Sequence, residues 1–135
     1  MKFTSWNIRG LGSKRKQRML SFRMKQDTPD IIFIQETKSS VQKIRAIHSK
    51  WLQRFEFLEV KADNTAGGIL TPWNPQKVRV LDAKASRNYL SVDIQPEGVA
   101  ETFLGTNVYG PQRAEDKLRL LESLIDLRNR QNGIP

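Results

Sequence analysis

The segment Asp30-Ile31-Ile32-Phe33-Ile34-Gln35-Glu36-Thr37-Lys38 decides the fold prediction for this chain. Its centre, 31–34, is a short continuous apolar run that follows the turn-forming sequence Thr28-Pro29-Asp30. Such a run is typical of a β-strand that is buried on both faces, as strands of α/β proteins are. The run ends abruptly at polar residues, so Glu36 stands at the carboxyl end of the predicted strand.

The flanking sequence predicts a strand, a helix and then a second helix around this segment. Residues 2–8 alternate in a way that favours a strand with Trp6 and Ile8 facing the core. Ser13 is placed to cap a helix over 14–26, in which Met19, Leu20 and Met24 lie near one face. A second helix is expected over 40–55.

The second half of the chain has the character of an all-β segment followed by one helix. Five strands are expected, at 57–60, 67–71, 78–81, 89–94 and 102–108. Turn residues such as 73–76 and 95–98 separate the last four, and this spacing predicts an antiparallel meander. A third helix is expected over 114–130, and 132–135 has the character of a helix stop leading into another strand.

Length and composition exclude several classes of protein. The 135 residues allow one small domain, and 38% hydrophobic with 27% charged residues is a globular mixture. The chain has no cysteine and one histidine, His48, which excludes a disulfide framework, a thiol nucleophile and a Cys- or His-rich metal site. There is no membrane-spanning run and no signal-peptide core, so we expect an intracellular protein, neither secreted nor membrane-bound.

The net charge of +9 is carried by the first 50 residues, which hold 12 Lys and Arg against 3 Asp and Glu. This excess predicts a polyanionic partner, most simply nucleic acid. A solvated basic helix that serves solubility is the alternative. The residues expected to contact nucleic acid are Arg9, Lys14, Arg15, Lys16, Lys38 and Trp73. Trp73 is expected to be exposed in a turn, where it could stack on a base, or else to anchor that loop.

Asn7 and Glu36 are the first pair of candidate site residues, because each ends a predicted strand. If the two strands are neighbours, an amide and a carboxylate meet at the sheet edge where α/β proteins bind ligands. These oxygen ligands suit a hard cation such as Mg²⁺, whereas the alternative is a surface Glu and a turn Asn. Tyr109 also ends a strand, and its phenol could bind a phosphate oxygen or simply pack over the turn that follows.

Three segments follow one another along the chain: Ser5-Trp6-Asn7-Ile8-Arg9-Gly10, the segment from Asp30 to Lys38, and Asn107-Val108-Tyr109-Gly110-Pro111. Together they resemble the endonuclease/exonuclease/phosphatase family, particularly the apurinic-type endonuclease domains of plant LINE-type (non-LTR) retrotransposons. Gly67-Gly68-Ile69 also resembles the glycine pair before a core strand of that family.

The resemblance implies a fold and a chemistry. The fold is an α/β (α+β) four-layer α/β/β/α sandwich with two facing mixed or antiparallel sheets. In the family, the Glu that matches Glu36 is a divalent-metal ligand, the Asn that matches Asn7 orients the metal site and phosphate, and the Tyr that matches Tyr109 contacts the scissile phosphate. The implied activity is Mg²⁺- or Mn²⁺-dependent phosphodiester hydrolysis, with DNA as the partner and a nuclear location.

Two family segments have no counterpart here, a Gly-Asp-x-Asn segment and a Ser-Asp-His segment. We therefore expect residues 1–135 to be a single partial domain, the N-terminal half of the sandwich, with 133–135 leading into the missing strand. The expected partners are the missing C-terminal half and, in a full element, a reverse transcriptase domain. We expect weak Mg²⁺ binding and no activity in this chain alone. The alternative is a non-catalytic nucleic-acid-binding remnant that uses the basic N-terminal helix.

Overall fold

The computed structural model describes residues 1–63, 66–110 and 114–131, which form seven strands and three helices. Each predicted element is present, with bounds that differ by a few residues. The predicted strand lead-in at 133–135 lies outside the described residues. In chain order the elements are β1 (Phe3–Asn7), α1 (Lys14–Asp27), β2 (Ile31–Gln35), α2 (Val41–Trp51), β3 (Glu56–Val60), β4 (Ile69–Trp73), β5 (Val78–Ala85), β6 (Tyr89–Pro96), β7 (Phe103–Val108) and α3 (Ala114–Gln131).

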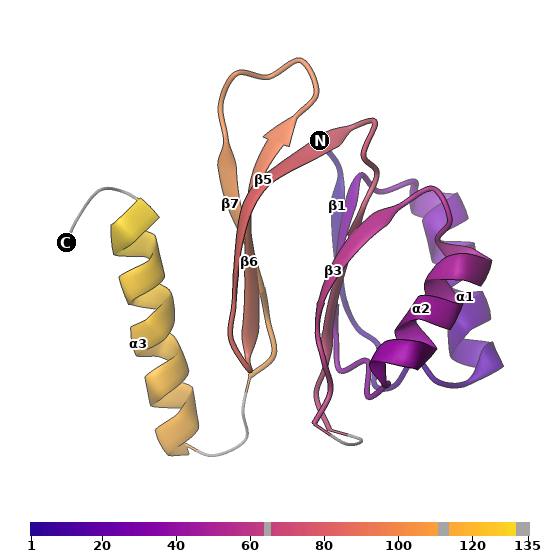
Figure 1. The fold of residues 1–135 in the computed structure, drawn as a ribbon, viewed down its shortest axis with the longest axis horizontal. Helices are drawn as coiled ribbons and strands as arrows, with labels where there is room; N and C mark the ends of the chain where they lie inside the picture. The colour runs from indigo at the N-terminus through magenta and orange to yellow at the C-terminus, as the bar shows by residue number, and fades with distance from the viewer. Residues whose placement is uncertain (64–65, 111–113, 132–135) are drawn as a thin grey trace.

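The elements form two sheets and two helical layers. The first sheet has the strand order β1-β2-β4-β3, and the second has the order β5-β6-β7. Figure 1 shows α1 and α2 covering the outer side of the first sheet, the two sheets facing each other, and α3 beyond the second sheet. This arrangement confirms the predicted mixed α/β fold with two facing sheets.

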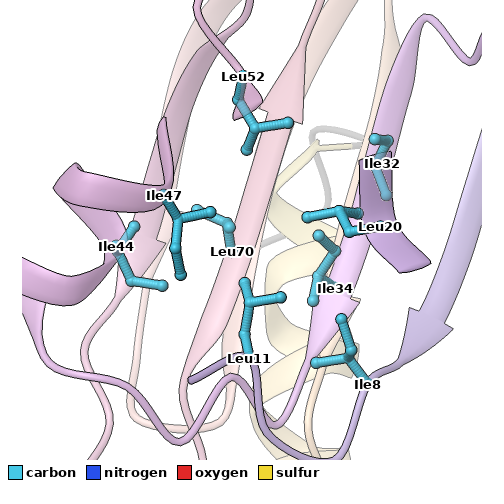
Figure 2. Packing of buried hydrophobic residues seen from close by; sticks show 9 residues of the cluster. All are labelled: Ile8, Leu11, Leu20, Ile32, Ile34, Ile44, Ile47, Leu52 and Leu70. Atoms are coloured by element: carbon cyan, nitrogen blue, oxygen red, sulfur yellow. The ribbon is translucent and has the colours of Figure 1, made fainter. Parts of the chain in front are cut away.

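Strand β2 is buried on both faces, as its continuous apolar run predicts. Ile32 and Ile34 belong to the core between the first sheet and the helices, whereas Ile31 and Phe33 belong to the core between the two sheets. Figure 2 shows the helix-side core. Its buried residues are Ile8, Leu11, Leu20, Ile32, Ile34, Ile44, Ile47, Leu52 and Leu70.

Both helices that cover the first sheet begin at serine caps. The Ser13 side chain accepts a hydrogen bond from the Lys16 N–H, which confirms the predicted cap, and Ser40 does the same for α2. The expectation that Met19 lies near the buried face of α1 is wrong, because it is 41% exposed. Gln17 takes a buried position instead, where its side-chain oxygen accepts a hydrogen bond of 3.1 Å from the Trp51 indole.

The predicted four-stranded meander is wrong in one strand. β4 lies in the first sheet between β2 and β3, and only β5, β6 and β7 form the antiparallel meander. Every residue of β4 is buried, so this strand needs cover on both faces. At the centre of the first sheet, the helices cover one face of β4 and the second sheet covers the other. A strand added to the end of the three-stranded meander would lack this cover.

Candidate functional site

The carboxyl ends of β1 and β2 lie side by side. The two strands pair in parallel, with Asn7 opposite Gln35, so Glu36 follows directly beyond the pair. This confirms that the strands carrying Asn7 and Glu36 are neighbours. The Asn7 side chain is exposed and its Oδ1 accepts a hydrogen bond of 3.2 Å from the Arg9 N–H. The Glu36 side chain is half-buried.

Backbone hydrogen bonds hold the loop after β1 against the end of β2. The Gly10 N–H donates to the Glu36 carbonyl at 2.7 Å, and the Leu11 N–H donates to the Thr37 carbonyl at 2.9 Å. Leu11 is fully buried, so it anchors this loop in the helix-side core. The position of the Glu36 backbone is therefore set by two strands and a buried anchor.

Gly67 and Gly68 supply the third side of this edge. The Thr37 N–H donates to the Gly68 carbonyl at 3.2 Å, and the Lys38 N–H donates to the Gly67 carbonyl at 2.8 Å. Both glycines have positive φ, and a Cβ on Gly68 would overlap with Thr37 Oγ1. Only glycine allows this close approach without displacing the Thr37 side chain.

Tyr109 lies beside Gly67, the first glycine of this pair. A Cβ built on Gly67 would be 3.5 Å from Tyr109 Cε2, which is ordinary van der Waals contact. The Tyr109 N–H donates to the Asn88 carbonyl at 2.8 Å, and Asn88 Nδ2 donates to the Tyr109 carbonyl at 3.2 Å. The structure thus brings Asn7, Glu36 and Tyr109 to one edge of the sandwich. We call the surface formed by Asn7, Glu36, Gly67, Gly68 and Tyr109 the candidate edge.

Asn107 joins the two sheets directly below the candidate edge. Its side chain is 1% exposed, and its Oδ1 accepts a hydrogen bond of 2.7 Å from Gln35 Nε2. Its Nδ2 donates to the carbonyls of Ile34 and Leu70 at 3.2 Å each and to Thr71 Oγ1 at 3.0 Å. The sequence alone predicts no role for Asn107. The available signal was an amide two positions before Tyr109, on the same face of a strand.

Most of the predicted basic contacts surround the candidate edge. Arg9, Lys14, Arg15 and Lys38 are exposed on the two loops and on the first turn of α1. Lys16 is half-buried, and its ammonium donates a hydrogen bond of 2.8 Å to the Ile8 carbonyl. Its charge therefore partly serves to hold the loop after β1.

The prediction of an exposed Trp73 is wrong. Trp73 is the last residue of β4, is 6% exposed, and belongs to the core between the sheets together with Ile31 and Val78. The strand continues through Pro72, since Thr71 lies opposite Leu58 and Trp73 opposite Glu56 in the pairing with β3. In this position the Trp73 indole is not accessible for stacking on a base.

The helix ends add to the positive potential at the candidate edge. α1 and α2 begin after the loops that carry Arg9 and Lys38, and their first turns contain no acidic residue. A helix N-terminus carries roughly half a positive charge and exposes unpaired N–H groups. Loops, helix ends and basic side chains therefore favour an anion at the same surface.

The donors at the candidate edge fit a hard divalent cation. Within the ranges that the structure describes, the Glu36 carboxylate makes no hydrogen bond and no ion pair. Across the same ranges, no group of three or more His, Cys, Asp or Glu residues could share a metal ion. One carboxylate and one amide oxygen leave most of the coordination to water or phosphate, which Mg²⁺ accepts and which makes binding weak.

His48, the single histidine of the sequence, lies away from this surface. Its Nε2 is 2.6 Å from the Phe55 carbonyl, and its ring packs on Phe57 at 4.8 Å between centroids. It is thus a packed helix residue that joins the end of α2 to the start of β3. The candidate edge gains no base from it.

Solved structures with the same arrangement are known. The 3′ phosphatase NExo from Neisseria, bound to a product DNA hairpin, matches with a TM-score of 0.73 and 17% identity, over 98% of this chain and 53% of that chain. The fold is that of the endonuclease/exonuclease/phosphatase proteins. D. rerio TDP2, complexed with a single-strand DNA product, matches with a TM-score of 0.66 and 18% identity, over 97% of this chain and 54% of that chain.

A phosphatase of a different substrate class shares the fold. The mannosyl-6-phosphatase from Bacteroides thetaiotaomicron matches with a TM-score of 0.73 and 10% identity, over 99% of this chain and 62% of that chain. This chain thus spans between about half and three-fifths of the length of these solved structures. No protein-family model and no curated protein sequence matches the chain.

No helix in the described part of the chain combines the length and the apolar character that a bilayer crossing requires.

Proposed function

We propose that the candidate edge is the metal- and phosphate-binding part of a Mg²⁺- or Mn²⁺-dependent phosphodiester hydrolase that acts on DNA. The observation that carries the proposal is the half-buried, unpaired Glu36 carboxylate beside the exposed Asn7 amide, at the joined ends of two parallel strands. The fold shared with DNA-bound TDP2 and NExo supports the substrate class. The segments quoted above favour the endonuclease of a LINE-type element, working beside a reverse transcriptase domain in the nucleus.

The roles follow from the chemistry of each side chain. Glu36 and Asn7 would hold the cation, which would neutralise phosphate charge and lower the pKa of a bound water. The Tyr109 hydroxyl donates a hydrogen bond to a phosphate oxygen. The exposed Arg9 and Lys38 side chains attract the DNA backbone to this edge.

We further propose that this chain alone hydrolyses DNA poorly or not at all. Among the described residues, none at the candidate edge is a histidine, and the one histidine of the sequence is packed against Phe57. The lack of a general base typically costs about 10²- to 10⁴-fold in rate. One carboxylate with one amide also gives weak affinity for the ion.

The test compares Mn²⁺ binding by the wild-type chain and Glu36→Gln, from the electron paramagnetic resonance signal of free Mn²⁺. Removing a residue that hydrogen-bonds to a metal ligand typically lowers metal affinity by roughly 10- to 100-fold. Glu36 is proposed as a ligand itself, so we expect Glu36→Gln to lower Mn²⁺ affinity by more. Glu101→Gln is the matched control, because Glu101 is an exposed carboxylate outside the candidate edge. Equal Mn²⁺ affinities for both variants would refute the metal site.

The second candidate function is nucleic-acid binding without catalysis. It is favoured by the four exposed basic side chains Arg9, Lys14, Arg15 and Lys38 around the candidate edge. Under this function, Glu36→Gln leaves DNA affinity unchanged or raises it, because a negative charge near phosphate is removed. Metal-dependent plasmid nicking that disappears in Glu36→Gln would decide for the hydrolase and would also contradict the proposed inactivity.

A further inference from the structure

A concave surface lies at the opposite end of the first sheet from the candidate edge, between the carboxyl-terminal ends of α1 and α2. Its volume is about 460 Å³, within the range of roughly 300–1,000 Å³ that small-molecule sites occupy. We call it the α1–α2 cleft. The residues that carry the argument are Met24, Lys25, Lys50, Trp51, Arg54 and Phe55.

The rim of the α1–α2 cleft is positively charged. Lys25, Lys50 and Arg54 are exposed, none of them makes an ion pair with another described residue, and no acidic side chain lines the cleft. The two helix ends contribute roughly −0.5 charge each. Three cations therefore exceed what the helix ends can neutralise, and a charge of about +2 remains for an anion.

The floor of the α1–α2 cleft is apolar and aromatic. Trp51, Phe55 and Met24 are half-buried, so each keeps part of its surface in contact with solvent. The Trp51 ring is fixed because its Nε1–H donates a hydrogen bond of 3.1 Å to Gln17 Oε1. The Lys50 ammonium lies over the same ring, 5.0 Å from its centroid, so a base that stacks on this face of the indole takes the place of the cation, which is then free to bind the adjoining phosphate.

We propose that the α1–α2 cleft binds one nucleotide of a single-stranded nucleic acid, with its phosphate on Lys50 and Arg54 and its base against Trp51. A cationic rim around an aromatic floor matches the two parts of a nucleotide. The base must be unstacked to enter a concave surface, which favours a single strand over a duplex. A flat anionic membrane would leave the aromatic floor without contacts.

This site is separate from the proposed hydrolase function. The cleft is built from the far ends of α1 and α2, and it shares no residue with the candidate edge. Glu36→Gln should therefore leave binding at the cleft unchanged. A failure of the metal site and a failure of the cleft are thus distinguishable in one set of variants.

The experiment measures the anisotropy of a labelled oligothymidylate of roughly 10 nucleotides as salt is varied between about 50 and 200 mM. The double variant Lys50→Ala/Arg54→Ala removes two charges from the cleft. The control Arg79→Ala/Lys84→Ala removes two exposed charges from β5, on the second sheet, so both proteins have the same net charge. Trp51→Leu removes the aromatic surface and keeps both charges.

Two phosphate contacts to a single strand contribute about 1.4 to the slope of log affinity against log salt concentration, which corresponds to roughly 25-fold in affinity at 0.1 M salt. We expect Lys50→Ala/Arg54→Ala to lose both contacts and therefore this affinity and this part of the slope. The control Arg79→Ala/Lys84→Ala should lose much less affinity. Trp51→Leu should weaken binding by roughly fivefold or more. The proposal is overturned if the two double variants bind equally, or if the cleft variant loses binding to phosphatidylserine vesicles or to polyglutamate but not to the oligonucleotide.

Discussion

Replacing Asn107 with alanine should destabilise the protein more than its place near a strand end suggests. The side chain is 1% exposed and lies within hydrogen-bond distance of four groups on the first sheet, three of which share the two hydrogens of its Nδ2. Alanine leaves Gln35 Nε2, Thr71 Oγ1 and the carbonyls of Ile34 and Leu70 without this partner. The carbonyls lie in paired strands and Gln35 has other acceptors, so the loss at Thr71 and the loss of bonding between the sheets dominate.

The magnitude follows from the number of bonds. Asn107 provides two N–H donors and one acceptor, and each net hydrogen bond contributes about 1 kcal/mol. The small cavity and the buried hydroxyl without a partner add about 1–2 kcal/mol. We expect the free energy of unfolding to fall by about 4 kcal/mol, a large part of the roughly 5–15 kcal/mol of a typical domain.

Urea denaturation followed by tryptophan fluorescence measures this loss, because Trp73 lies in the core between the sheets. Ser5→Ala is the control, since it removes an exposed hydrogen bond of 3.2 Å that Gln35 Nε2 donates to Ser5 Oγ in the same network. Ser5→Ala should lower the free energy of unfolding by less than about 0.5 kcal/mol. A loss below about 1 kcal/mol in Asn107→Ala, with unchanged slope, would refute the reasoning about the buried amide.

Two further predictions concern single positions. Gly68→Ala should lower the melting temperature clearly more than Gly98→Ala does. Both glycines have positive φ, but only a methyl group at position 68 would overlap with Thr37. Equal shifts of the melting temperature in differential scanning calorimetry would contradict the close approach of Gly68 to Thr37. Burial raises the pKa of Glu59 above 4.5, with Arg45 partly opposing. The folded state therefore holds the proton more tightly, and wild-type stability falls as pH rises from about 4.5 through the raised value. Glu59→Gln should have a higher melting temperature than wild type at pH 7 and the same melting temperature near pH 4. A difference in melting temperature that grows as the pH falls would contradict a raised pKa.

Local sequence was sufficient to predict the elements of this fold but not the sheet to which each belongs. The apolar run of β2 and the serine caps act within a few residues, so pattern and capping rules locate them. The place of β4 depends on pairing with β2 and β3, and nothing within 69–73 distinguishes those partners from β5. The sequence places Trp73 in a turn for the same reason, because Pro72 and Asn74 resemble a strand end when burial by the second sheet is unknown.

The candidate edge was predictable in part. Neighbouring parallel strands bring their carboxyl ends together, so Asn7 and Glu36 could be paired from sequence once the strands were located. The roles of Asn107 and Gly68 depend on contacts with residues more than 30 positions away. A period of two places Asn107 on the same face as Tyr109, but it does not say what covers that face.

The backbone itself sets the candidate edge apart from the other strand ends. Arg9, Glu36 and Lys38 all have φ near +50°, a conformation that costs a non-glycine residue about 1–2 kcal/mol. Of the described non-glycine residues, only Thr28 shares it, and there it caps the end of α1. Glycine would relieve this strain at each position, and the chain uses glycine for such turns nearby, at Gly10 and Gly67. Backbone strain of this kind clusters at functional sites, so its concentration on these hydrogen-bonded loops supports the binding roles proposed for Arg9, Glu36 and Lys38.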